Sequence, residues 1–168
     1  MGDRLTRTLM LAIMLALAGA RPAFAQSRRA HADSVRIVAE LAGLDSAWHS
    51  GDADAWVAHY ASDADFVGFV NISGTRMTDR ATLRERLARI FAGMFRGSRH
   101  VGTLQRLRFL GAHIAVADED IEITGFAALP AGISATAPGV LRTRMRHVLV
   151  RRGRRWLIVA SQNTAVAP

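Results

Sequence analysis

The sequence predicts an α+β domain whose helices come first and whose antiparallel sheet comes after them. Apolar residues recur at helical spacing over about 33–49, 53–60 and 79–95. After residue 100, apolar and polar residues alternate and turn residues separate the stretches, which is typical of strands joined by turns. Because helices and strands do not alternate along the chain, this order favours a meander packed on helices over a parallel sheet of βαβ units.

The first 25 residues have the three parts of a cleavable signal peptide. Arg4 and Arg7 give a positive start, and residues 9–20 form an unbroken run of apolar or small residues. Ala-Phe-Ala at 23–25 then supplies the small-x-small pattern that precedes cleavage. The apolar run is shorter than the roughly 20 residues of a membrane span, so cleavage is favoured over an uncleaved anchor. We therefore expect a bacterial protein that is periplasmic or secreted.

The chain beyond the signal peptide is long enough for one domain with a real core. Residues 26–32 are polar and are expected to form a flexible leader, and 33–165 are expected to form a single domain. The chain has no cysteine, which excludes disulfides, thiolate metal sites and cysteine nucleophiles. No later stretch is long and apolar enough to predict a stable membrane span.

The charge is strongly biased, because all 22 basic residues are arginine and the formal net charge is +8. Such a balance can bind nucleic acid or an anionic membrane. However, the arginine groups lack interleaved aromatic residues, and an exported protein meets little nucleic acid. We interpret the arginines as a solvated surface, and nucleic acid is not expected as a partner.

Each expected helix has its own sequence signals. The apolar positions of the first share one face and are Ile37, Leu41, Leu44 and Trp48. Asp33 or Ser34 can cap its start. Asp52 is the expected N-cap of the second helix, and Gly97 suits the end of the third.

The expected strands are bounded by turn residues. They cover about 64–70, 75–77, 100–110, 113–126, 140–151 and 155–165. Residues 127–139 are nearly all small or turn-forming and are expected to be a loop.

Several segments, in the right order, resemble a known superfamily. They are AWHSGDADA at 47–55, DADFV at 63–67, the apolar helix at 83–95, RLRFL at 106–110, HVLVRRGRRW at 147–156 and SQNT at 161–164. Together they resemble the SnoaL-like, nuclear-transport-factor-like superfamily, and within it the SgcJ/EcaC-type subgroup most of all. The resemblance covers about 33–165.

The resemblance implies a cone-shaped, curved, mixed or antiparallel sheet packed on three N-terminal helices, as in ketosteroid-isomerase-like and cystatin-like α+β rolls. It also implies a mostly apolar pocket inside the cone and often a homodimer through the outer face of the sheet. Related folds include isomerases, cyclases, dehydratases, hydrolases and pure ligand binders, so the fold alone does not give the reaction. The functional residues of ketosteroid isomerases align with Leu44, Gly68 and a position near Arg146, so steroid isomerisation is not expected.

Asp118 and Asp120 are the most suggestive acidic residues. Ile114 and Val116 mark an apolar face of their strand, and continuing that alternation places both acids on the same face. Two interpretations remain open. In one, the strand has a bulge and the acids face solvent. In the other, they point into the pocket, where burial would raise their pKa values and suit them to acid–base catalysis.

Two histidines are candidates for proton transfer. His147 lies on the penultimate strand, where it is either a proton shuttle or a structural residue. His100 begins a strand close to the aromatic end of the third helix, a position that fits the mouth of a pocket.

The ligand-binding candidates are polar and aromatic. Of the alternating Arg142, Arg144 and Arg146, we expect Arg146 to be the one that points inward, and by the alignment Asn163 faces the cavity, where it can orient a carbonyl or hydroxyl. The aromatic candidates are core residues that also form a pocket wall in a cone fold. They are Trp48, Trp56, Tyr60, Phe66, Phe91 and Phe95.

The sequence carries no metal-binding spacing, no glycine-rich phosphate loop and no nucleophile elbow, so no cofactor and no metal are predicted. The function indicated is binding of a small, largely apolar molecule, with cofactor-free acid–base chemistry if the protein is an enzyme. Asp118 or Asp120 would be the base, with His100 or His147 assisting. The alternative is a non-catalytic ligand-binding or dimerisation module of the periplasm.

Overall fold

The structure is a computed structural model that describes residues 28–167 in two units, 28–35 and 36–167. The expected signal peptide and residues 26–27 of the expected leader lie outside the described residues. Residues 28–50 are helical, so the first helix begins before its predicted start at about residue 33. Ser34 donates its hydroxyl to the carbonyl of Ala30, a bond made inside a helix, and therefore does not cap a helix start.

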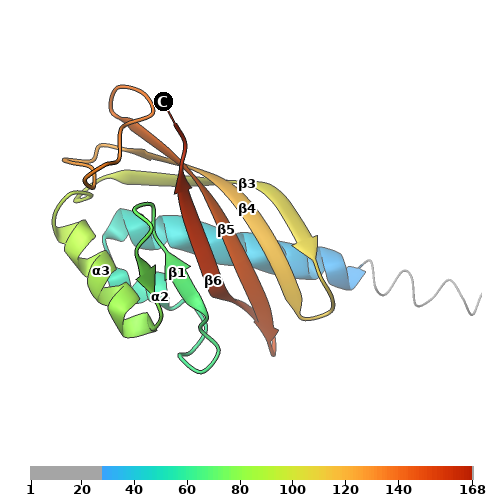
Figure 1. The fold of residues 1–168 in the computed structure, drawn as a ribbon. Coiled ribbons are helices and arrows are strands. Elements are labelled where there is room, and N and C mark those ends of the chain that lie inside the picture. Colours follow the sequence, from blue (N-terminus) through green and yellow to red (C-terminus); the bar gives the residue numbers. More distant parts are fainter. Residues whose placement is uncertain (1–27, 168) are drawn as a thin grey trace, which may run out of the picture. The chain divides into compact units, whose positions relative to one another are not determined.

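The second unit is built on one curved sheet of six strands, which confirms the α+β prediction (Figure 1). The strands are β1 Gly68–Val70, β2 Arg76–Met77, β3 Arg99–Phe109, β4 Ile114–Thr124, β5 Val140–Arg152 and β6 Arg155–Ala165. Their order in the sheet is β2-β1-β6-β5-β4-β3. The β1–β6 pair is parallel and every other pair is antiparallel, so the sheet is mixed.

The strand predicted over 64–70 is shorter than expected. The backbone N–H groups of Asp65 and Phe66 both donate to the carbonyl of Ser62, which closes a turn. The strand β1 therefore begins only at Gly68, although an isolated bridge between Tyr60 and Ile158 already joins the preceding segment to β6.

Two further helices, α2 Ala53–Val57 and α3 Arg80–Ala92, pack with the sheet. Asp52 caps α2 as predicted, because its side chain accepts a hydrogen bond from the N–H of Ala55. Both helices end three residues before their predicted ends. After α3 the N–H of Phe95 bonds to the carbonyl of Ile90, so the last apolar residues of this segment lie in a turn.

The core lies between the helices and the inner face of the sheet. Ile37, Leu41 and Leu44 of the first helix belong to the same buried cluster as Ile121 of β4 and Leu149 of β5. The helical apolar stripe predicted from the sequence is therefore the stripe that is buried.

Side chains of β4 alternate strictly between the two faces of the sheet. Ala115, Ala117 and Glu119 are buried, whereas Ile114 is 44% exposed. The register between β4 and β5 has no shift, and the irregularity in the β3–β4 pairing lies between Leu104 and Arg106 of β3. Ile114 and Val116, which share a face with Asp118 and Asp120, thus lie on the outer face of the sheet. No bulge on β4 is needed to place the two acids there.

We predict that Asp79, the N-cap of α3, stabilises the domain in a pH-dependent way. Its carboxylate accepts hydrogen bonds from the backbone N–H and the hydroxyl of Thr82, and the backbone bond is the main reason that the pKa of Asp79 is lowered. Because the folded-state pKa is the lower one, this stabilisation is complete above the unfolded-state pKa of about 3.9 and is lost as the pH falls below it. Asp79→Ala should lower the Tm by a few degrees at pH 7 and by less at pH 2.5.

Asp79→Asn is the matched control, because asparagine caps helices but does not titrate. Its Tm difference from wild type should be small at pH 7. A loss for Asp79→Ala that is the same at both pH values would contradict the prediction.

Candidate functional site

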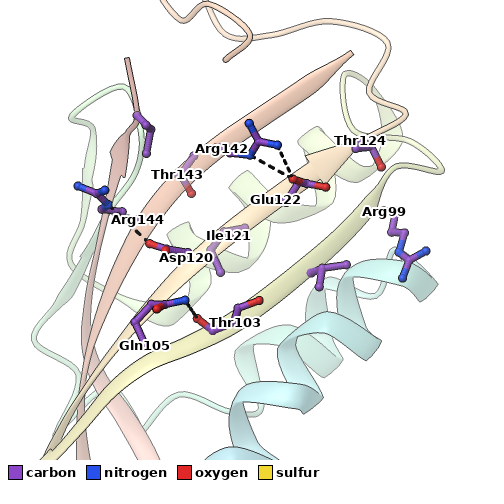
Figure 2. A pocket seen from close by; sticks show the side chains of 12 residues that line it. Arg99, Thr103, Gln105, Asp120, Ile121, Glu122, Thr124, Arg142, Thr143 and Arg144 are labelled. Atoms are coloured by element: carbon purple, nitrogen blue, oxygen red, sulfur yellow. Dashed lines mark hydrogen bonds and ion pairs between the residues drawn. The ribbon is translucent and has the colours of Figure 1, made fainter. Parts of the chain in front are cut away.

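The outer face of the sheet carries a wide, shallow groove of about 650 Å³ (Figure 2). Charged side chains from neighbouring strands pair across it. Arg142 lies 3.0 Å from Glu122, and Arg144 lies 3.6 Å from Asp120, in both cases nitrogen to oxygen. These side chains are about half or more exposed, so the groove is a solvated ladder of ion pairs and each pair contributes little stability.

Asp118 extends this ladder, so of the two interpretations left open by the sequence it is the pocket-facing one that is wrong. Nε and Nη2 of Arg146 donate to its two carboxylate oxygens over 2.6 and 3.1 Å. These hydrogen bonds are the main reason that the pKa of Asp118 is lowered, whereas the pocket interpretation required a raised pKa. Arg146 also points outward, with 67% of its side chain exposed. Asp118, Asp120 and Arg146 are thus on the opposite face of the sheet from the interior.

A small cavity of about 70 Å³ lies on the inner face, among α3, the first helix and the sheet. Its walls are mainly apolar. Five candidates from the sequence line it: Trp48, Trp56, Phe95, His100 and Asn163. Three others, Tyr60, Phe66 and Phe91, are buried in the core but are not among the residues that line this cavity.

His100 is the ionisable group best placed in this cavity. It is 3% exposed, and its Nδ1 lies 2.5 Å from Oδ1 of Asp45 on the first helix. Asp45 also accepts from the backbone N–H of Gly102, which lies 3.1 Å from each carboxylate oxygen. The carboxylate therefore fixes the imidazole through Nδ1, and Nε2 remains as the second ring nitrogen for a ligand.

Two tryptophans hold the imidazole plane. The ring of Trp48 lies 4.8 Å from that of His100 at 31°, and the ring of Trp56 meets it edge-on at 5.7 Å. Trp48 is itself fixed, because its indole N–H donates to the hydroxyl of Ser98 over 2.9 Å. His100 is thus held in one orientation by packing as well as by its hydrogen bond.

Three residues that line the cavity have a buried polar side-chain atom without a hydrogen-bond partner among residues 28–167: Nε1 of Trp56, the hydroxyl of Thr143 and Oδ1 of Asn163. Thr143 is 1% exposed, and within residues 28–167 neither its hydroxyl nor Oδ1 of Asn163 has a hydrogen-bond partner. Both residues line the cavity that contains His100. Buried polar atoms usually have hydrogen-bond partners, so Thr143 and Asn163 mark a place where a ligand can form the missing hydrogen bonds.

A second buried polar cluster lies further along the sheet. Nδ1 of His147 is 2.7 Å from the hydroxyl of Ser161, which is 3.1 Å from the hydroxyl of Tyr60. Nε2 of His147 is 3.2 Å from Oε2 of Glu119, close enough for a charge interaction but not aligned as a hydrogen bond. Burial raises the pKa of Tyr60 well above its ordinary value, which keeps that phenol neutral. None of the four residues lines the cavity, so His147 belongs to a network within the core.

Sequence reasoning missed Asp45, Thr143 and Glu119. Asp45 lies beside Leu41, Leu44 and Trp48 on the helical wheel, and an acid at the edge of a buried stripe was the available signal. The sequence does not show that Thr143 and Glu119 point inward, because this depends on which faces of β4 and β5 are buried.

Among the described residues, no group of three or more His, Asp or Glu side chains is arranged to hold a metal ion. Within the same part of the chain, no helix is both long and apolar enough to cross a bilayer.

No protein-family model matches the sequence, and no curated protein matches it either. Solved structures do resemble the fold. An NTF-2-like protein of unknown function from Shewanella oneidensis is 14% identical with a TM-score of 0.62, over 79% of this chain and 98% of that one. A putative scytalone dehydratase from Novosphingobium aromaticivorans is 11% identical with a TM-score of 0.68, over 83% of this chain and 88% of that one.

A ketosteroid isomerase-like protein from Erwinia carotovora is 15% identical with a TM-score of 0.64, over 80% of this chain and 96% of that one. At these identities the likeness concerns the fold alone. It confirms the predicted nuclear-transport-factor-like, cystatin-like α+β fold.

We predict that the unpartnered hydroxyl of Thr143 destabilises the domain. Thr143→Val removes it at nearly constant shape, so the free energy of unfolding should rise by about 1 kcal/mol. Ser161→Ala is the comparison, because it removes a buried hydroxyl that has two partners, and it should lower the free energy of unfolding. Urea unfolding of both variants measures the two effects, and a loss of stability in both would show that the Thr143 hydroxyl is bonded.

Proposed function

We propose that this domain is an enzyme that transfers a proton to and from carbon without a cofactor, with His100 as the general base. The observation that carries the proposal is the His100–Asp45 pair in a small, mainly apolar cavity. A buried imidazole fixed by a carboxylate is the arrangement that positions a base for catalysis.

The geometry assigns a role to each partner. With Nδ1–H donating to Asp45, the lone pair of a neutral His100 is on Nε2, which takes a proton from a carbon–hydrogen bond of the substrate. The carboxylate of Asp45 stabilises the imidazolium that forms. His100 then returns the proton, either to another carbon, which is an isomerisation, or to a departing hydroxide, which completes a dehydration with release of water.

Two further considerations support catalysis over a pure binding module. A ligand-binding cavity needs no converging ionisable groups, whereas here a histidine and a carboxylate converge. The names of two structural neighbours, a putative dehydratase and an isomerase-like protein, also suggest reactions of this kind. As part of the same proposal we place the chain in the SgcJ/EcaC-type subgroup, on the motifs at 47–55 and 147–156.

The test uses cyclopentanone, a small ketone whose α-protons exchange with deuterium when a base removes them. We expect the wild-type protein to accelerate this exchange in D₂O, measured by proton NMR. His100→Asn should reduce the acceleration by about 10²- to 10⁴-fold, the usual contribution of a general base. Asp45→Asn should reduce it to a smaller extent, because the base remains but its orientation and charge partner are lost.

Asp118→Asn is the matched control, because it changes an acid on the outer face that is paired with Arg146. It should leave the exchange rate unchanged. Full exchange activity in His100→Asn, or no acceleration by the wild type, would contradict the proposed function.

We also propose that the protein is exported and forms a homodimer through the outer face of its sheet. The tripartite pattern of residues 1–25 supports export, and the resemblance to homodimeric domains supports the dimer. Protein purified from the periplasm of a bacterial host should begin at Gln26 on N-terminal sequencing and have twice the chain mass by light scattering. A retained N-terminus would contradict export, and a monomer mass would contradict the dimer.

A further inference from the structure

We propose that the inner cavity takes a small alcohol, a molecule with an apolar body and a hydroxyl group that binds between Thr143 and Asn163. This names the substrate class of the proposed enzyme and so rests on the proposed function, although the binding claim is tested separately.

The first argument is the chemistry of the two unpartnered atoms that the sheet contributes, the hydroxyl of Thr143 and Oδ1 of Asn163. Oδ1 of Asn163 can only accept a hydrogen bond, so its partner must donate. The hydroxyl of Thr143 can donate or accept. A ligand hydroxyl satisfies both at once, since it donates to Asn163 and accepts from Thr143. A ketone oxygen can accept a hydrogen bond from the Thr143 hydroxyl, but it cannot donate one to Oδ1 of Asn163.

The second argument is the position of the two residues. Thr143 and Met145 lie two apart on β5, and Asn163 of β6 pairs directly with Met145. Thr143 and Asn163 are therefore diagonal neighbours on adjacent strands, a separation that one small group can bridge. Their side chains share the inner face, because Thr143 and Met145 are both buried.

The third argument is the rest of the wall. Apolar side chains surround the polar pair, including Phe69, Met77, Leu83 and Leu141, and half-buried Arg86 of α3 is the one arginine among the lining residues. Against the apolar side chains an ion would lose its hydration, whereas a neutral alcohol loses little and gains two hydrogen bonds. The wall beside the polar pair thus favours a neutral, apolar body.

The fourth argument is size. At about 70 Å³ the enclosed space admits only a small group, and the polar pair and His100 line that same space. Half-buried Asn71, Ile72, Ile90 and Pro130 also line the cavity, which places its open side between the β1–β2 turn, α3 and the loop before β5. A ligand larger than the cavity extends through this opening.

The experiment compares cyclopentanol with cyclopentanone, which have similar shapes but differ in their ability to donate. Their dissociation constants are measured by NMR titration of the isotopically labelled protein. The wild type should bind cyclopentanol about tenfold more tightly, the value of one further hydrogen bond to a buried group. Asn163→Leu should abolish this preference, and Thr143→Val should weaken cyclopentanol binding several-fold.

Gln162→Leu is the matched control, because Gln162 is the exposed neighbour of Asn163 on β6. It should keep the preference. Equal affinities in the wild type, or an undiminished preference in Asn163→Leu, would overturn the inference. If the wild type shows the preference but His100→Asn keeps the full exchange of cyclopentanone protons, the proposed function fails while the alcohol site stands.

Discussion

The strict alternation of side chains across β4 and β5 is the constraint on which the rest of the structure depends. β4 and β5 pair without a register shift, so acids of β4 meet arginines of β5 on the outer face along the whole ladder. A slip of one residue would move every side chain of a strand to the other face. It would bury Asp120 and Arg144 and expose Ile121. The charged outer face and the apolar inner face therefore specify the same register.

Polar groups on the inner face fall into two sets that differ in how they are satisfied. His147, Ser161 and Tyr60 are joined in the core by hydrogen bonds to the Ser161 hydroxyl, and Nε2 of His147 lies 3.2 Å from Glu119 without a hydrogen bond. At the cavity, Thr143 and Asn163 have unpartnered atoms among the described residues. An unpartnered buried polar group lowers the stability of the fold. Such groups are therefore expected at ligand-binding sites, where a bound ligand supplies the missing hydrogen bond.

The sequence predicted much of the architecture because the signals for it are local. The apolar period of the first helix and the Asp52 cap are read within a few residues, and β6 has the bounds 155–165 that were predicted. The sequence also identified His100 and Asn163 as candidates. The direction of Asp118 and Asp120 stayed open because Ile114 and Val116 are apolar yet lie on the outer face, so the apolar alternation did not show which side of β4 faces the core.

The sequence by itself determined the α+β class, the order of the elements and the arginine-only basic surface, since each follows from composition or from short-range periodicity. Only the tertiary structure decided which parity of each strand faces inward, because that choice depends on how six strands register and on which face the helices cover. The packing of the first helix on this face also brings Asp45 next to His100, although the two residues are 55 positions apart in the sequence. Contacts of that range leave no local pattern in the chain, so the pairing of His100 with Asp45 is visible only once the sheet has folded against the first helix.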